Sequence, residues 1–264
     1  MAPAAAALFA PDGEEFAAAA HARGPWDERM MHGGAPAALL AGTIEATEPG
    51  DELVVTRLTI EFLSGVPLGS VRVTSQLARP GRRFQVVDAT LDAGGRHACL
   101  ARATRVRRAD LPGAAASPAG EVGLPASPDE GEIMTPFSQD SSEQFHPDAC
   151  EIRRVGGEFG SGAVAAWIRL RCPVVTGQSP SQLQRTAAAA DFTNGLSWIV
   201  SFDDWLFVNT ELTVHLAREP EGEWIGVDAR SSISPAGFGL STAGLHDRHG
   251  PFGACAQSLF VQPR

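Results

Sequence analysis

Cysteine is scarce in this chain, and its four cysteines form no C-x-x-C pair. Two of them, Cys99 and Cys255, lie inside short apolar runs of the kind that form buried strands. This placement predicts reduced thiols in the core and no disulfide framework. Such thiols are typical of a reducing, cytoplasmic environment.

Basic residues and long apolar runs are scarce as well. Lys and Arg number 21 against 31 Asp and Glu, so the formal net charge is -10. Because nucleic acids and anionic membranes are bound through clustered cations, we expect neither as a partner. No stretch approaches the ~20 apolar residues that span a bilayer. The N-terminal MAPAAAALFAPDGEEF has no basic region, which makes it a poor secretory signal.

Familiar catalytic motifs are also absent: the sequence has no G-x-S-x-G, G-x-x-x-x-G-K-[ST], G-x-G-x-x-G or H-E-x-x-H. His246, Asp247 and His249 have the side chains of metal ligands, but they fall in a predicted hairpin turn. No further ligand follows at a recognisable spacing. We therefore expect neither a metal nor a cofactor.

The sequence does contain an internal repeat. Leu58–Phe62 matches Leu212–Leu216 about 154 positions later, and each run is followed by Pro and Gly. The match extended by eye sets Ala38 against Asp191, and Ala101 against Gln257. An acid and an amide present in only one copy indicate a single active site on a pseudo-twofold frame.

Each copy reads as one apolar helix followed by four strands of period two, separated by Pro-Gly and Gly-Gly turns. In the second copy, Ser181 and Gln184 form a capping-box signature that predicts a helix start. The sequence therefore predicts an α+β fold of two halves, residues 1–108 and 143–264. Residues 109–142, rich in Pro, Gly and Ala, are expected to form an irregular linker.

Several stretches in this order resemble the double-hotdog acyl-CoA thioesterases of the thioesterase II group. They are Gly24-Pro25-Trp26 with His32-Gly33-Gly34, Arg79-Pro80-Gly81-Arg82, Ala190-Asp191-Phe192, the strand from Asn209 to Arg218, and Gln257. The resemblance implies a double hotdog, in which two tandem halves each wrap an antiparallel sheet around a central helix. It also implies hydrolysis of acyl-CoA without a cofactor.

In that family an Asp, a Thr or Ser, and a Gln hold a water against the thioester. The resemblance places these roles on Asp191, Asn209 and Gln257, with Thr210 replacing Asn209 if the register slips by one residue. Asn209 has a side-chain amide at the position where the family has the hydroxyl group of Thr or Ser. Without the resemblance, Asp191 could instead face solvent near a helix end, and Gln257 could be a core amide satisfied by backbone.

Two further segments are candidate substrate contacts. Backbone N–H groups of His32, Gly33 and Gly34 precede a helix and could meet a thioester oxygen or a phosphate, although turn glycines explain the same pattern. Arg82 beside a Pro-Gly turn could meet the phosphates of coenzyme A, the alternative being a solvated basic turn.

The sequence thus predicts an acyl-CoA thioesterase. The main alternative is a non-catalytic acyl-CoA or acyl-lipid binding module of the same fold, which the departure at Asn209 motivates. An enoyl-CoA hydratase is less favoured, because no Asp and His set surrounds Asp191 in the sequence. Acyl chain length is not indicated, and a homo-oligomer is compatible with the sequence.

Overall fold

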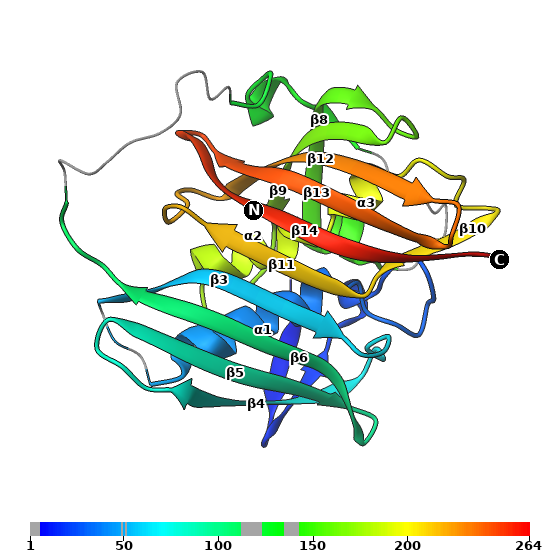
Figure 1. The fold of residues 1–264 in the computed structure, drawn as a ribbon. Helices are drawn as coiled ribbons and strands as arrows, with labels where there is room; N and C mark the ends of the chain where they lie inside the picture. The colour runs from blue at the N-terminus through cyan, green and yellow to red at the C-terminus, as the bar shows by residue number, and fades with distance from the viewer. Residues whose placement is uncertain (1–5, 49, 51, 112–122, 135–142) are drawn as a thin grey trace.

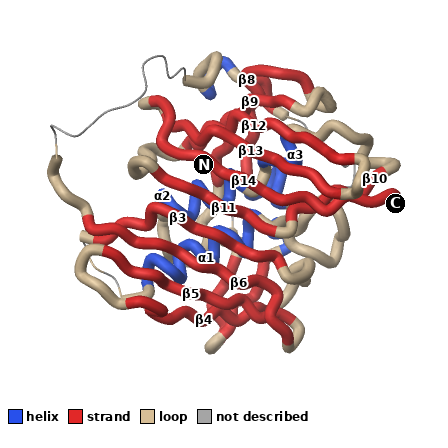
Figure 2. Tube along the Cα trace, in the orientation of Figure 1, coloured by secondary structure: helices blue, strands red, loops and turns tan. Residues whose placement is uncertain are grey.

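The computed structural model describes residues 6–48, 50, 52–111, 123–134 and 143–264. Their strands form one continuous antiparallel sheet that runs through both halves of the chain, with the helices gathered behind it (Figures 1 and 2). The N-terminal half contributes α1 (Gly34–Ala46), β3 (Leu53–Phe62), β4 (Ser70–Arg79), β5 (Phe84–Ala93) and β6 (Arg96–Arg107). The predicted helix followed by four strands is present in this half, but the strands are not a simple antiparallel meander as expected. Their order is β4-β5-β6-β3, because β3 pairs with β6 and not with β4.

The C-terminal half repeats the pattern with additions. Its elements are β8 (Cys150–Glu158), β9 (Ala163–Leu170), α2 (Gln182–Ala190), α3 (Thr193–Leu196), β10 (Trp205–Asn209), β11 (Glu211–Leu216), β12 (Trp224–Ser234), β13 (Phe238–Asp247) and β14 (Gly250–Pro263). Two short strands that the sequence analysis missed, β1 (Phe9–Asp12) and β2 (Glu15–Ala18), extend the edge beside β4.

The two halves meet where β3 pairs with β11, and this pairing fixes the symmetry of the repeat. Thr59 lies opposite Thr213, its own counterpart 154 positions later, and their hydroxyl groups are 3.3 Å apart. Two strands related by a twofold axis must pair in this way at the axis. The strand part of the predicted repeat is therefore confirmed.

The same offset of 154 positions relates the neighbouring strands β6 and β14, and this corrects part of the predicted repeat. Ile60 pairs with Ala101, and its counterpart Val214 pairs with Cys255. The counterpart of Ala101 is thus Cys255, and Gln257 corresponds to Ala103. The amide still belongs to one half only. The match of Ala38 with Asp191 lies in the helices, outside this register, and stays a prediction.

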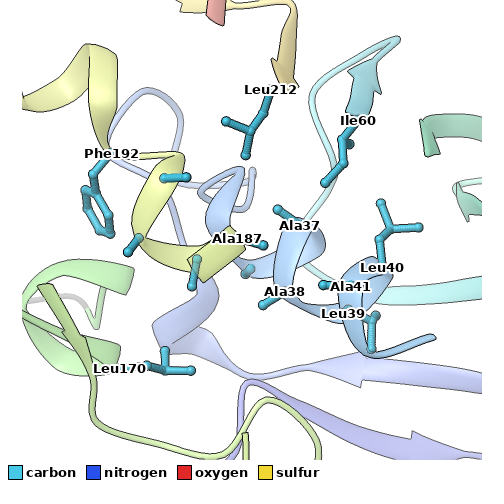
Figure 3. Close-up of a cluster of buried hydrophobic side chains, with 14 of the residues drawn as sticks. Ala37, Ala38, Leu39, Leu40, Ala41, Ile60, Leu170, Ala187, Phe192 and Leu212 are labelled. Atoms are coloured by element: carbon cyan, nitrogen blue, oxygen red, sulfur yellow. The ribbon is translucent and has the colours of Figure 1, made fainter. Parts of the chain in front are cut away.

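Small side chains let α1 and α2 pack closely. Ala37, Ala38 and Ala41 lie on α1 and Ala187 on α2, with Leu212 and Ile60 of the sheet beside them (Figure 3). The predicted capping box starts α2, because Ser181 Oγ accepts from Gln184 N at 3.1 Å and Gln184 Oε1 accepts from Ser181 N at 3.0 Å. All four cysteines are free and buried, as predicted.

Part of the predicted linker is structured. Within residues 123–134, β7 (Glu132–Ile133) pairs with β8, and Trp167 Nε1 donates to Ala126 O at 2.8 Å. Leu124 covers Gly226, where a Cβ would lie 2.2 Å from its methyl group. Leu124 and the Ala126 carbonyl thus pack this part of the predicted linker on the sheet, while apart from β7 and a 3-10 turn at Pro128–Glu130 its described residues lie outside helices and strands, as expected of an irregular segment. The rest of that prediction, residues 112–122 and 135–142, lies outside the described residues.

Candidate active site

A cavity of about 340 Å³ lies between the two halves. Residues 23–33 ahead of α1, residues 62–66 after β3, the turn between α2 and α3, and the end of β10 all contribute to its wall. Most of the lining is apolar, with the side chains Trp26, Met30, Met31, Phe62, Met134, Phe192 and Phe202. A cavity of this size and character suits an apolar group of a small ligand.

Asp191 lies in the cavity wall at the C-terminal end of α2, and only 4 % of its surface is exposed. Asn209 Nδ2 donates to its Oδ1 at 2.9 Å. The carboxylate therefore does not face bulk solvent, as the alternative interpretation required. Chain segments 18 positions apart bring these two side chains together, because β10 runs back past the end of α2.

Asn209, and not Thr210, occupies the position beside Asp191. The Thr210 hydroxyl donates instead to Ser258 O at 3.3 Å, in the break between β10 and β11. Consecutive strand residues point to opposite faces, so only one of the two can reach the carboxylate. The side-chain amide of Asn209 therefore contacts Asp191, and its assignment to the family's hydroxyl position stays a prediction.

Gln257 supports the site from beneath. It is fully buried and does not line the cavity. Its Oε1 accepts from Asn194 N at 3.0 Å, and its Nε2 lies 3.4 Å from Asp191 O and 3.5 Å from Asp191 Oδ1. The predicted convergence with Asp191 is present, but so are the backbone contacts of the alternative interpretation. Gln257 holds the turn that carries Asp191.

His32 contributes its side chain, which the sequence analysis did not consider. Nδ1 lies 3.1 Å from Asp191 Oδ2, and the ring packs in a cluster with Phe145 and Phe192, at centroid distances of 4.7 and 4.4 Å from the imidazole and 5.6 Å from each other. Residues 159 positions apart in the sequence meet here, and no local pattern announces the contact. The His-Gly-Gly motif was the available signal, and it was assigned to the backbone alone.

The two glycines after His32 differ in their roles. Gly34 N donates to His32 Nδ1 at 3.0 Å, and Gly34 does not line the cavity, so its N–H is not offered to a ligand. Gly33 lines the cavity, and a Cβ there would lie 2.8 Å from Asp191 Oδ2. The start of α1 can approach the carboxylate this closely only because residue 33 has no side chain.

We expect Gly33→Ala to reduce any activity that depends on Asp191 by about 10-fold or more, since the new methyl group must displace the carboxylate. Steady-state rates of the purified variant would measure this. Gly69→Ala is the matched control, because a Cβ at Gly69 meets no atom within 4 Å. Wild-type rates in both variants would show that the close approach at Gly33 has no functional consequence.

The remaining candidates lie away from the carboxylate. Arg82 is exposed in the turn between β4 and β5 and does not line the cavity, so its contact with a phosphate stays a prediction. The arginine that does line the cavity is Arg23, which has no ion pair within the described residues. Asp247, considered as a metal ligand, is bound by Arg218 at 2.5 and 2.7 Å.

In the described part of the chain, no helix is long and apolar enough to cross a membrane. No curated protein sequence matches the chain. Solved structures do match over nearly its whole length, at identities that establish the fold. A crystal structure from Novosphingobium aromaticivorans, assigned as a thioesterase, is 21% identical with a TM-score of 0.72 and covers 99% of this chain and 100% of its own.

Two further structures agree. A hot dog fold protein of unknown function from Alicyclobacillus acidocaldarius has a TM-score of 0.73 at 15% identity, covering 96% of this chain and 95% of its own. An acyl-CoA thioesterase II from Mycobacterium marinum has a TM-score of 0.64 at 14% identity, covering 96% and 93%. The predicted double-hotdog fold is confirmed.

The family models for the N-terminal and C-terminal domains of acyl-CoA thioesterase match residues 22–107 and 118–261. Their order along the chain is that of the two halves described above. The chain therefore belongs to the acyl-CoA thioesterase family.

Proposed function

We propose that this protein hydrolyses acyl-CoA thioesters to the free acid and coenzyme A, with a water molecule activated by the negative charge of Asp191. The observation that carries the proposal is the buried Asp191 carboxylate, fixed by Asn209 at the wall of an apolar cavity. A carboxylate buried in an apolar cavity wall is shielded from bulk water. It can act only on a water molecule inside the cavity, where the substrate binds, and this arrangement suits hydrolysis.

The cavity wall offers each further part of the reaction. Its aromatic and Met side chains take the acyl group, and the Gly33 N–H at the start of α1 is placed to donate to the oxyanion of the tetrahedral intermediate. Gln257 and Asn209 keep the carboxylate in position. Asn209 replaces the family's hydroxyl by an amide that serves as a donor to Asp191.

Water is a better nucleophile here than the nearby thiols. Burial, with a smaller effect of the Asp191 charge, raises the pKa of Cys99 to about 12. Burial is also the main cause that raises the pKa of Cys255 to about 11. Both thiols stay protonated at neutral pH and neither lines the cavity, so a covalent acyl-cysteine is disfavoured.

The test is a panel of acyl-CoA substrates, from short to long and from straight-chain to aromatic, with colorimetric detection of the free thiol of released coenzyme A. Thermal-shift titration with a non-hydrolysable acyl-CoA analogue runs alongside. Release of thiol from at least one substrate supports the proposal. Stabilisation by the analogue with no thiol release from any substrate would favour the non-catalytic binding module.

The His32–Asp191 contact also favours testing hydration of enoyl-CoA. From the sequence a hydratase is less favoured, because no His lies near Asp191 along the chain, but the structure brings His32 there from the other half. Including a 2-enoyl-CoA in the panel separates the reactions. Hydration removes the conjugated double bond without releasing thiol, whereas thioester hydrolysis releases it.

A further inference from the structure

We propose that Arg23 binds a carboxylate at the far end of the acyl group, so that the protein acts on acyl-CoA thioesters of dicarboxylic acids. This inference rests on the proposed function and adds to it the chemical class of the acyl group. It starts from Arg23, which lines the same cavity as Asp191. Arg23 Nε is buried without a hydrogen-bond partner, and its guanidinium forms no ion pair with the described residues.

An arginine in this state lacks the partner that its chemistry requires. The guanidinium stays protonated in proteins and has several N–H donors but no acceptor. Because a buried donor without an acceptor destabilises the fold, buried polar atoms nearly always have a partner. The Nε–H and a terminal N–H together form a fork that binds both oxygens of a carboxylate or phosphate. Arg23 in the cavity wall is therefore suited to an oxyanion of a ligand.

Neither carboxylate of the cavity wall serves as this partner. Asp27 is bound by Arg29, whose Nε and Nη2 donate to it at 3.0 and 2.7 Å. Asp191 accepts from Asn209 Nδ2 at 2.9 Å and forms no ion pair with Arg23. The charge of Arg23 is thus left for a group that enters the cavity.

Gln144 adds a second polar side chain near Arg23. Phe145 N donates to Arg23 O at 2.9 Å, which places Gln144 on the segment beside Arg23. Only 8% of the surface of Gln144 is exposed, and the residue lines the cavity. Its side-chain amide makes no hydrogen bond with the described residues. This amide is a second donor for an oxyanion that enters this part of the cavity.

The position of Arg23 favours a carboxylate on the acyl group over a phosphate of coenzyme A. Arg23 pairs with Met31 in an antiparallel bridge. The next residues along, Ala22 and His32, are joined by a hydrogen bond of 2.9 Å, and the His32 side chain lies 3.1 Å from Asp191. In coenzyme A, the whole pantetheine arm separates the sulfur from the nearest phosphate. An anion in the same cavity as the Asp191 carboxylate is therefore more readily one that the acyl group carries.

Such a site distinguishes acyl groups by their charge. An acyl chain that ends in a methyl group leaves Arg23 and Gln144 without an acceptor inside the cavity. A chain that ends in a carboxylate provides one, and the positive charge of Arg23 offsets the repulsion from Asp191. The protein is therefore expected to prefer the half-thioester of a dicarboxylic acid over the monocarboxylic thioester of equal length.

The test compares adipyl-CoA with hexanoyl-CoA and suberyl-CoA with octanoyl-CoA, pairs that differ only in a terminal carboxylate in place of a methyl group. We expect the wild-type kcat/KM to be about 10-fold or more higher on the dicarboxylic member of at least one pair. Arg23→Gln should lower kcat/KM on that member by about 10-fold or more, and on its monocarboxylic partner by less than about threefold. Arg23→Lys, which keeps the charge without the fork, should lie between the wild type and Arg23→Gln.

Two controls isolate the contact. Arg96→Gln removes one positive charge from an exposed residue that does not line the cavity, and it should keep wild-type rates. The N-acetylcysteamine thioester of hexanoic acid has the same acyl group as hexanoyl-CoA but no phosphate. A loss in Arg23→Gln on hexanoyl-CoA that is absent on this thioester would mean that Arg23 binds a phosphate of coenzyme A. That result would overturn the carboxylate.

Other results would overturn it as well. Equal wild-type rates within each pair would do so, and so would an Arg23→Gln variant that keeps the wild-type preference. An equal loss on every substrate would also do so, because a structural role of Arg23 explains it. A wild-type protein that releases no thiol fails the proposed function instead. Thermal shifts with the non-hydrolysable thioether analogues of adipyl-CoA and hexanoyl-CoA then test Arg23, and equal shifts by both would overturn the inference.

Discussion

Asp191→Asn lowers acyl-CoA hydrolysis by about 100-fold or more and leaves acyl-CoA binding nearly intact. Asparagine has the shape of aspartate, and its carbonyl oxygen can still accept from Asn209 Nδ2, so the wall of the cavity keeps its form. What disappears is the negative charge. Without it, an attacking water has no charged group beside it that can accept its proton or stabilise the positive charge developing during proton transfer.

The measurement is kcat and KM on the best substrate, with the thermal shift produced by a non-hydrolysable analogue as the binding readout. Asp203→Asn is the control for removal of one acidic charge, because Asp203 is exposed and does not line the cavity. A wild-type kcat in Asp191→Asn would contradict the mechanism. Together with retained binding, it would move the chemistry to another part of the cavity.

Combining this change with Gln257→Ala tests whether the two residues act as one unit. Gln257 acts on the reaction through Asp191, whose carboxylate it contacts at Oδ1 and whose turn it holds at Asp191 O and Asn194 N. Once the side chain at position 191 has lost its charge, moving it out of place lowers the rate of hydrolysis only slightly more. The double variant is therefore expected to be barely slower than Asp191→Asn alone, well short of the product of the two single effects.

The parts of this protein that could be predicted from its sequence are those governed by local patterns. Period-two strands, the capping box at Ser181 and the buried setting of Asp191 all depend on neighbours within a few residues. The strands β3 and β11, which pair where the two halves meet, could be identified because the repeat provides two copies to compare. The error of two positions at Gln257 arose because a match by eye has no strand pairing to fix it.

The contact between His32 and Asp191 could not be predicted in this way. It joins the loop ahead of α1 to the end of α2, and the local sequence of each segment gives no indication of its contact with the other. Docking of the two helices through small Ala and Gly side chains determines how close they come. That distance is a tertiary property, and a single sequence without structure carries no periodic signal for it.

Asp247→Ala lowers the free energy of unfolding by about 3 kcal/mol, the lower end of the range for removing one partner of a buried ion pair, because the Arg218 side chain is only partly buried. The Asp247 side chain is fully buried, and Arg218 donates to both of its oxygen atoms at 2.5 and 2.7 Å. Backbone N–H groups of Glu221 and His249 add bonds at 2.9 and 2.8 Å. Asp247, considered above as a metal ligand, thus stabilises the turn between β13 and β14 through its carboxylate.

The Arg218–Asp247 ion pair also predicts how the free energy of unfolding depends on pH. Burial by itself raises the pKa of Asp247, but the hydrogen bonds from Arg218, Glu221 and His249 outweigh it and lower the pKa below its ordinary value. A carboxyl group with a lowered pKa in the folded state contributes stability above its unfolded pKa of about 3.9. That contribution is lost as the pH falls through the folded pKa.

Urea unfolding at pH 7 and at a series of values from about pH 4 downward measures both effects. The stability difference between the wild type and Asp247→Ala should be largest at neutral pH and shrink as the acid is protonated. Asp129→Ala is the control, because its ion pair with Arg248 is exposed and should be worth less than about 1 kcal/mol. Equal, small losses in both variants would mean that burial gives the Arg218–Asp247 pair no advantage over a surface pair.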